Sequence, residues 1–127
     1  MSDYLIDSFG WIEVLTDGPK ASEFKKIILS DARLIVSSIV LVEIAAKFHS
    51  LGRNEEARQA IGSIKQRAQV IEVSDWIADT AGRIWAENRS KKMGLVDCII
   101  LATAMQEKAV VLTGDAHFKE FKNAKVV

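Results

Sequence analysis

The stretch Tyr4-Leu5-Ile6-Asp7-Ser8 places a short apolar run directly before an aspartate and a serine. Apolar residues in unbroken succession indicate a short buried strand. Trp11, Ile12 and Leu15 then follow helical spacing, and Ser8 is a candidate N-cap for that helix. In an open parallel α/β sheet, ligands bind outside the carboxyl ends of the strands, where Asp7 would lie.

Short apolar runs and amphipathic helices alternate along the rest of the chain. The patterns predict further strands at residues 34–36, 70–73, 110–112 and 125–127, and helices at 21–29, 39–50, 54–68, 74–92 and 95–108. Five strands separated by helices predict an α/β fold, with a parallel sheet covered on both faces. Trp85 fits the buried stripe of the 74–92 helix, whereas Trp11 is a candidate for a surface used by a partner.

The composition indicates a single globular domain without a disulfide or a membrane span. The 127 residues, 49% of them hydrophobic, predict a single domain over residues 1–127 with a substantial core. The 17 basic and 17 acidic residues cancel, so any nucleic-acid binding has to be local. The single cysteine, Cys98, excludes an internal disulfide and fits a reducing cytoplasm. No apolar stretch approaches the roughly 18 residues of a membrane span, so we expect a soluble cytoplasmic protein without membrane contact.

Carboxylates recur where predicted strands end or predicted helices begin, at Asp7, Glu43, Asp97 and Asp115. Gathered in one pocket they would repel strongly, and hard divalent cations such as Mg²⁺ or Mn²⁺ suit all-oxygen ligands. Three of these acids also have an ordinary structural explanation. Asp7 could be a turn or capping residue, and Glu43 could lie on a solvated helix face together with Lys47. Asp97 could be present because the helix dipole favours an anion in the first turns of a helix. Glu43 is the hardest to dismiss, because its neighbours are strongly apolar and Glu is rarely buried unless paired or coordinating.

The segments that carry these acids resemble the motifs of PIN-domain nucleases, most closely the compact toxins of VapBC-type toxin–antitoxin pairs. The matching segments are residues 4–8, 37–43, 94–104 and 112–118, in order over nearly the whole chain. The resemblance implies a PIN-like three-layer fold with a five-stranded parallel sheet in the order 3-2-1-4-5. It also implies a Mg²⁺- or Mn²⁺-dependent endoribonuclease that hydrolyses RNA phosphodiesters by metal-activated water.

The resemblance also carries roles to individual residues and implies partners. It assigns catalysis and metal binding to Asp7, Glu43, Asp97 and Asp115, with the hydroxyl of Thr113 assisting and Ser8 a weaker candidate. It implies a homodimer and a cognate antitoxin protein, besides the RNA substrate. For holding that RNA, the chain offers a basic cluster shortly before Asp97, which is otherwise a solvated helix end: Arg83, Arg89, Lys91 and Lys92.

Other functions compete with a toxin nuclease. A housekeeping RNA-processing PIN nuclease would use the same acids, and a non-catalytic PIN-like scaffold would bind RNA or protein without cleaving. A receiver-like phosphoacceptor needs a phosphorylatable Asp after the third strand, where Ser74 and Asp75 instead read as a helix start. A haloacid-dehalogenase-like phosphatase needs a second Asp two residues after the first, and that position is Phe9. His117 reads as a loop or packing histidine.

Overall fold

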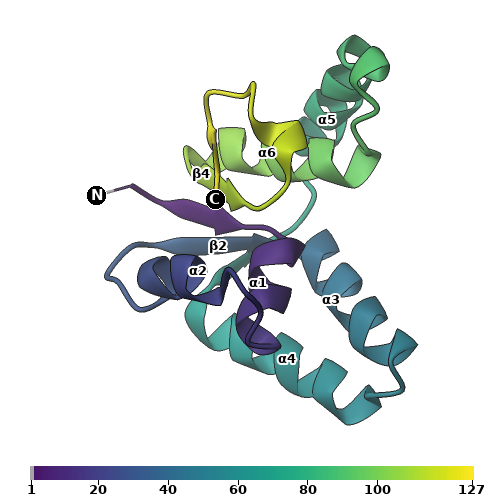
Figure 1. Ribbon diagram of the computed structural model, residues 1–127. Helices are drawn as coiled ribbons and strands as arrows, with labels where there is room; N and C mark the ends of the chain where they lie inside the picture. Colours follow the sequence, from purple (N-terminus) through teal and green to yellow (C-terminus); the bar gives the residue numbers. More distant parts are fainter. Residues whose placement is uncertain (1) are drawn as a thin grey trace.

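The computed structural model describes residues 2–127, and its strands form one five-stranded sheet in the order β3-β2-β1-β4-β5 (Figure 1). The strands are β1 (Tyr4–Ile6), β2 (Leu34–Ser37), β3 (Gln69–Ile71), β4 (Val110–Thr113) and β5 (Ala124–Val126). Every neighbouring pair is parallel, with Leu5 level with both Ile35 and Val111. The strand order and direction confirm the predicted PIN-like α/β fold.

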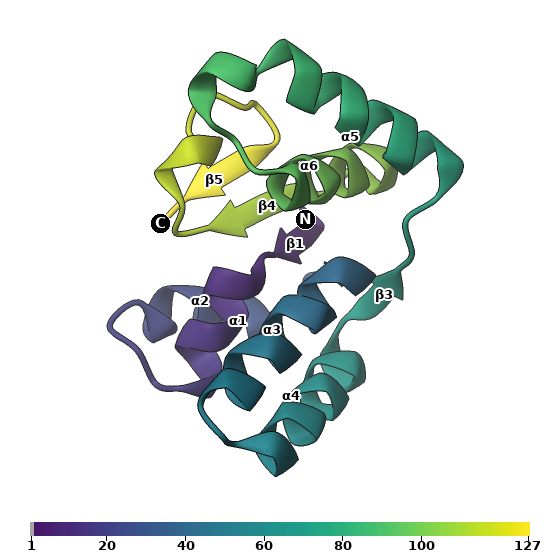
Figure 2. The same cartoon turned by 90° about the vertical axis from the view of Figure 1, so that its right-hand side faces the viewer.

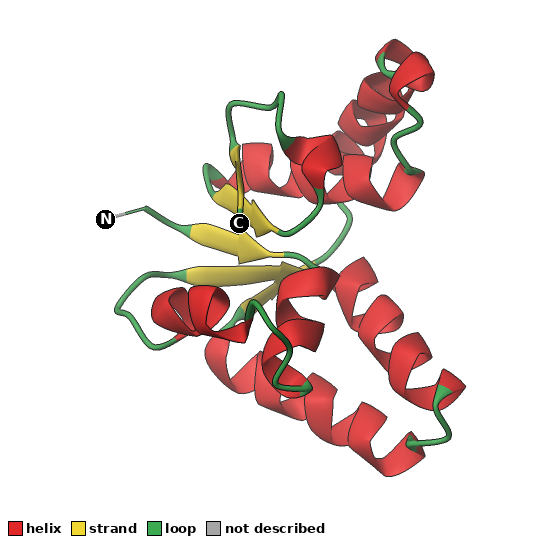
Figure 3. Cartoon of the chain, in the orientation of Figure 1, coloured by secondary structure: helices red, strands yellow, loops and turns green. Residues whose placement is uncertain are grey.

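Helices cover both faces of this sheet (Figures 1 and 2). The lower layer of Figure 1 holds α1 (Ser8–Leu15), α2 (Ala21–Ile28), α3 (Ser38–Ser50) and α4 (Asn54–Arg67). The upper layer holds α5 (Asp75–Glu87) and α6 (Leu95–Glu107). Two 3-10 turns, η1 (Arg89–Lys91) and η2 (Ala116–Phe118), follow α5 and β4. Figure 3 shows the three layers by secondary structure.

The core fills the space between the sheet and these helices. Leu5, Ile35 and Val111 on the central strands are fully buried, as are Ile44 of α3 and Ile100 of α6. Strands covered on both faces need apolar residues at successive positions, which explains why the strand runs do not alternate with polar residues. Within residues 2–127, no helix is long and apolar enough to cross a membrane.

Two tryptophan predictions are wrong. Trp85 is 41% exposed, because Ile84 takes the inward position on α5 and the next residue is rotated by about 100° around the helix. Trp11 is only 4% exposed and belongs to the core, so it is not a surface residue. Phe48, a second aromatic residue in the N-terminal helical layer, is buried as well.

Several element ends also differ from the prediction. The 74–92 helix stops at Glu87, where the side chain of Asn88 donates to the carbonyl of Ile84 at 2.7 Å. The third strand covers residues 69–71 and the fifth covers 124–126. Ser8 is the first residue of α1 rather than its N-cap, and Asp7 takes the capping position. Ser74 caps α5 as predicted, accepting from the N–H of Ile77 at 3.1 Å.

Candidate active site

Asp7 is held at the carboxyl end of β1 by contacts to both of its oxygens. As the N-cap of α1, it accepts a hydrogen bond from the Gly10 N–H at 3.0 Å through Oδ1. Its other oxygen accepts from the hydroxyl of Thr113 at the end of β4. The side chain is only 5% exposed. The sequence places a charge here because the tight strand-to-helix connection needs a capping acceptor.

The β4 side of the site is built on a short polar turn. The hydroxyl of Thr113 also accepts from the Asp115 N–H at 2.9 Å, which ties Asp115 to Asp7 through one shared group. Asp115 caps η2 by accepting from the N–H of His117 at 2.9 Å. Gly114, between Thr113 and Asp115, lies against Phe9. A Cβ on Gly114 would lie 2.2 Å from a carbon atom of the Phe9 ring. A side chain there would force Phe9 to move.

The remaining acids come from two helices on opposite faces of the sheet. Glu43 lies in the second turn of α3, and its Oε1 is buried without a hydrogen-bond partner among residues 2–127. Asp97 lies in the first turn of α6, where the helix dipole favours an anion. Because α3 follows β2 and α6 precedes β4, the fold brings both acids toward the end of β1.

The electrostatics show that the four acids act on one another. The pKa of Asp7 is raised to about 6, chiefly by burial and to a smaller extent by the charges of Asp97 and Asp115, while the Thr113 and Gly10 hydrogen bonds oppose the shift. Burial also raises the pKa of Asp97 to about 6, with added repulsion from Asp115 and Glu43 and an opposing effect of His117. The structure therefore brings all four predicted acids into one electrostatically coupled group, which we call the acid cluster.

The acid cluster offers donors of the kind that a hard divalent cation requires. It combines carboxylate oxygens, the Thr113 hydroxyl and a Glu43 oxygen that is buried without a partner, and it concentrates negative charge that a cation would offset. Within residues 2–127, no three Asp, Glu, His or Cys side chains converge closely enough to hold one ion as they stand. Coordination would therefore require these side chains to rotate toward each other.

Ser37 is a polar residue near the acid cluster that the sequence did not single out as a site candidate. It ends β2 next to β1, is fully buried, and has a hydroxyl without a partner in the described residues. This hydroxyl makes no capping hydrogen bond to α3. The signal for Ser37 was its position directly after the predicted strand at 34–36. His117, which the sequence predicts to be a loop or packing histidine, lies in η2, and its Nδ1 lies 2.9 Å from Asp115 Oδ1.

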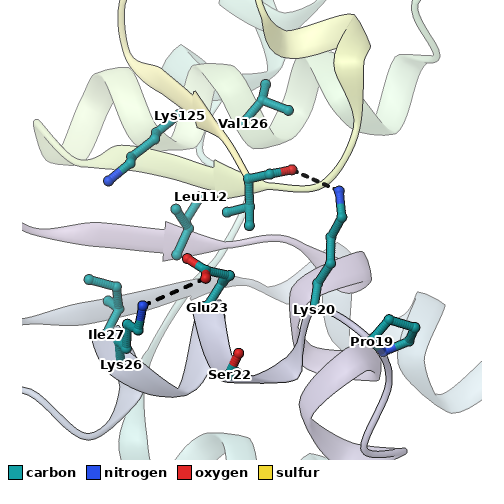
Figure 4. A pocket seen from close by; sticks show the side chains of 10 residues that line it. Pro19, Lys20, Ser22, Glu23, Lys26, Ile27, Leu112, Lys125 and Val126 are labelled. Atoms are coloured by element: carbon teal, nitrogen blue, oxygen red, sulfur yellow. Dashed lines mark hydrogen bonds and ion pairs between the residues drawn. The ribbon is translucent and has the colours of Figure 1, made fainter.

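A separate groove of about 650 Å³ lies between α2 and the ends of β4 and β5 (Figure 4). Its floor is apolar, with Leu112 and Ile27, and Lys20, Lys26 and Lys125 stand around it. Lys20 donates to the Val127 carbonyl at 2.8 Å. None of the four acids lines this groove, although the Asp7 N–H donates to the Leu112 carbonyl at 3.3 Å. The groove is therefore a neighbour of the acid cluster rather than part of it.

Comparison with known structures shows that the fold is shared with other solved proteins. The chain is similar to VapBC from Salmonella typhimurium bound to DNA, with TM-score 0.79, 20% identity, and coverage of 100% of this chain and 98% of that one. It is also similar to VapBC2 from Rickettsia felis bound to a promoter DNA fragment, with TM-score 0.78, 19% identity, and coverage of 98% and 96%. For the sarcin–ricin-loop-cleaving toxin VapC20 from Mycobacterium tuberculosis, the TM-score is 0.81 at 15% identity, with 98% of each chain covered.

Sequence comparison gives the family directly. No curated protein matches the chain, but the sequence pattern of the PIN domain family matches residues 4–124. This match covers β1 to β4, ends at the first residue of β5, and includes the four members of the acid cluster. It agrees with the strand order β3-β2-β1-β4-β5 and with the shared fold of the VapBC structures. The chain therefore belongs to the PIN domain family.

Proposed function

We propose that this protein is a Mg²⁺- or Mn²⁺-dependent endoribonuclease that acts as the toxin of a toxin–antitoxin pair. The observation that carries the proposal is the acid cluster, in which Asp7, Glu43, Asp97 and Asp115 are coupled at the carboxyl ends of the strands. Membership of the PIN domain family supports a nuclease, and the similarity of the fold to VapC20, a cleaving toxin, supports RNA as the substrate.

The chain's own residues would hold and orient the reacting groups. When bound, a divalent cation supplies a water of lowered pKa and neutralises charge on the phosphodiester. Asp7, Glu43, Asp97 and Asp115 would hold the cation. Thr113 fixes the Asp7 carboxylate by donating to it and positions Asp115 by accepting from its N–H. Gly10 restrains the other Asp7 oxygen, so this carboxylate is oriented before any ligand arrives.

The buried Glu43 oxygen supports a site that is completed by a ligand. A buried carboxylate oxygen without a partner costs free energy, of the order of 1–3 kcal/mol or more for a charged group. That cost is recovered when a cation or a water takes the vacant acceptor. Neither Cys98, which is buried, nor His117, which contacts Asp115, lies beside a nucleophile–base pair, so a covalent route has no support among residues 2–127.

An antitoxin is the protein partner that this proposal implies. The Rickettsia felis and Salmonella typhimurium structures are of VapBC, and a Klebsiella pneumoniae structure with the same fold is a toxin–antitoxin complex. For this chain, an antitoxin segment would lie against the N-terminal helices α1 and α2 and extend an arginine into the acid cluster. Arginine suits that position because its guanidinium pairs bidentately with carboxylates.

Cleavage of a single-stranded RNA in the presence of Mg²⁺ or Mn²⁺ tests the nuclease. The variants Asp7→Asn, Glu43→Gln and Asp97→Asn should each lower cleavage by about 10- to 100-fold or more, as expected for the loss of a residue that holds or orients a cation. Asp31→Asn is the matched control, because Asp31 is an exposed aspartate outside the acid cluster. Wild-type cleavage by all three acid-cluster variants would show that the reaction occurs elsewhere.

The same assay separates the competing functions. A non-catalytic scaffold would bind RNA without cleaving it in any divalent cation. A housekeeping nuclease would cleave RNA in vitro, but its expression would not arrest growth, whereas a toxin's expression would. Co-expression of the small protein encoded beside it should restore growth if that protein is the antitoxin.

A further inference from the structure

An exposed aromatic side chain and an arginine lie together at the carboxyl end of α5. Trp85 is 41% exposed, and the guanidinium carbon of Arg89, four residues later, lies 5.6 Å from the centroid of its ring. Asn88 fixes the chain between them by donating to the Ile84 carbonyl at 2.7 Å. Exposing a large indole surface to water is unfavourable, so the Trp85–Arg89 pair is a candidate binding surface.

The charge of this region fits a polyanion. Residues 83–92 contain four basic residues and one acidic residue, in a chain whose net charge is zero. Arg83 pairs with Asp79 at 3.0 Å and Lys91 with Glu120 at 2.5 Å. Arg89 and Lys92 have no carboxylate within 4 Å among residues 2–127. Arg89, which lies over the indole, and Lys92, three residues later in the chain, are therefore available to a ligand.

Contacts between η1 and the segment after η2 connect this surface to the acid cluster. Besides its ion pair with Glu120, Lys91 places its ammonium 6.0 Å from the centroid of the Phe121 ring. The η2 turn itself holds His117, which contacts Asp115. On its other side η1 leads through Gly94 into α6, whose first turn contains Asp97.

We propose that Trp85 and Arg89 form a platform on which an unpaired base of the RNA substrate stacks, while Lys92 contacts a backbone phosphate. This inference rests on the proposed function and specifies its substrate as single-stranded RNA or an unpaired loop. Indole and guanidinium planes both stack on nucleobases, and a base inside a duplex has no free face to offer. Such stacking tolerates any base, so the platform selects unpaired structure rather than sequence.

Binding measurements test the platform independently of cleavage. We would measure fluorescence anisotropy of a labelled single-stranded RNA and of its duplex, using an Asp97→Asn background that prevents cleavage. Trp85→Ala should weaken single-strand binding by about 5- to 100-fold, the usual range for losing one stacked base. Trp85→Tyr should restore most of the affinity, because the phenol ring still stacks. Trp76→Ala is the matched control, since Trp76 is also exposed on α5 but lies in its first turn.

Tryptophan fluorescence gives a second readout at the proposed contact. In a Trp76→Phe protein the remaining indoles are Trp85, which is exposed, and Trp11, which is buried. Single-stranded RNA should quench the exposed component, and duplex RNA should quench it much less. Thermal unfolding of each variant, compared with wild type, shows that the change in binding does not come from loss of the fold.

The outcomes for platform and nuclease are distinct. Equal affinity of the Trp85→Ala and Trp76→Ala proteins for single-stranded RNA, or equal quenching by single strand and duplex, would overturn the platform even if the enzyme cleaves RNA. Weakened binding by Trp85→Ala, restored by Trp85→Tyr, would support it. If the platform variants behave as expected but wild type cleaves no RNA with either cation, the catalytic proposal fails and RNA binding at this surface stands.

Discussion

Asp7 combines a structural and a proposed chemical role in one side chain. It caps α1, accepts from Thr113, and is nevertheless almost completely buried in a group of like charges. Two hydrogen bonds favour its ionised form, yet its pKa rises to about 6 because burial dominates. A folded protein that keeps such a charge at neutral pH loses stability by doing so, which is expected where a site is built for a ligand.

The free energy of unfolding of the metal-free protein should fall as the pH rises from about 4 to 7. The Asp7 and Asp97 carboxyls have pKa values near 6 in the folded chain and a reference value of 3.8, so the folded state binds protons more tightly. The free energy of unfolding therefore decreases between these two pKa values, because the folded state there keeps protons that the unfolded state has already released. For Asp7 the decrease is at most about 2–3 kcal/mol by pH 7. Urea unfolding between pH 4 and 8 in EDTA measures this change.

Asp7→Asn isolates the contribution of that carboxyl. The variant should flatten the decrease in stability between pH 4 and 7, because an amide can still accept from Gly10 but does not titrate. Asp31→Asn, at an exposed position, should leave the profile unchanged. A wild-type protein whose stability rises steadily over this range, with no effect of Asp7→Asn, would contradict the assigned burial penalty.

The sequence indicated that the four acids would lie near one another, because they stand beside predicted strand ends and helix starts. Asp7, Asp97 and Asp115 are close to the strands or helix starts that the apolar runs define. What the sequence did not show was which hydroxyls complete the site. Ser37 could not be separated from an ordinary helix cap, since its burial depends on neighbours that are remote in sequence. The predictions for Trp11 and Trp85 were wrong for a related reason. Helical periodicity alone does not define how wide the buried face of a helix is.

At the level of elements, the packing of α1 against the sheet depends on Gly10. A Cβ at this position would lie 2.6 Å from side-chain atoms of both Ile6 and Phe24, which are fully buried. Gly10→Ala should therefore destabilise the fold by about 1–3 kcal/mol through overpacking, despite the higher helix propensity of alanine. Chemical denaturation of the two proteins measures the difference.

Gly62 provides the control for this prediction. It lies inside α4, and a Cβ there would meet no atom within 4 Å. Gly62→Ala should stabilise the protein by about 0.5–1 kcal/mol, which is the propensity gain without a clash. If Gly10→Ala also stabilises the protein, α1 is not packed against Ile6 and Phe24 as tightly as the structure shows.

Helix ends were the least predictable elements. The helix predicted at 74–92 divides into α5 and η1, because the Asn88 side chain satisfies the Ile84 carbonyl and Lys92 adopts a left-handed conformation with φ of 55°. Neither residue is a strong stop signal in sequence, unlike Gly52, a glycine with φ of 72° just after the end of α3. This division places Trp85 and Arg89 at the end of α5, next to the η1 turn that leads into α6.

For the whole molecule, strand order was predictable only through the family resemblance. The apolar runs indicated a parallel sheet, but many orders of five strands satisfy that pattern. The order β3-β2-β1-β4-β5 places β1 at the centre, between β2 and β4, where Asp7 meets Thr113 directly. The PIN motifs contain this long-range information, which composition and periodicity lack.

The family resemblance also predicts a homodimer. Apolar side chains of the N-terminal helices are the candidates that the sequence offers for this contact: Phe9, Trp11, Ile12 and Phe48. Phe9 is exposed, whereas Trp11 and Phe48 are core residues, and Val42 of α3 and Met105 of α6 are further exposed apolar side chains. An isologous two-fold contact would bury such side chains on both copies. Sedimentation velocity of wild type should show a dimer at micromolar concentration, and a monomer throughout the accessible range would contradict this prediction.

Inhibition by the antitoxin should depend on competition for the acid cluster. If an antitoxin arginine pairs with these carboxylates, excess Mg²⁺ should weaken inhibition, and changing that arginine to alanine should weaken it strongly. The measurement is RNA cleavage at fixed antitoxin and increasing Mg²⁺. Inhibition that is equally strong after the arginine is removed, and insensitive to Mg²⁺, would place the block away from the acid cluster.

Calorimetric titration of the metal-free protein with Mn²⁺ at pH 7 tests most directly whether the acid cluster is a divalent-metal site. We expect saturable binding by wild type and by Asp31→Asn, and binding weakened by at least 10-fold in Glu43→Gln and in Asp97→Asn, as is typical for losing a residue that holds or orients a metal. Repeating the titration at pH 6 should add proton release on binding, because Asp7 and Asp97, with pKa values raised to about 6, are partly protonated at that pH. Equal Mn²⁺ affinity in wild type, Glu43→Gln and Asp97→Asn, or no saturable binding by wild type, would contradict the proposed function.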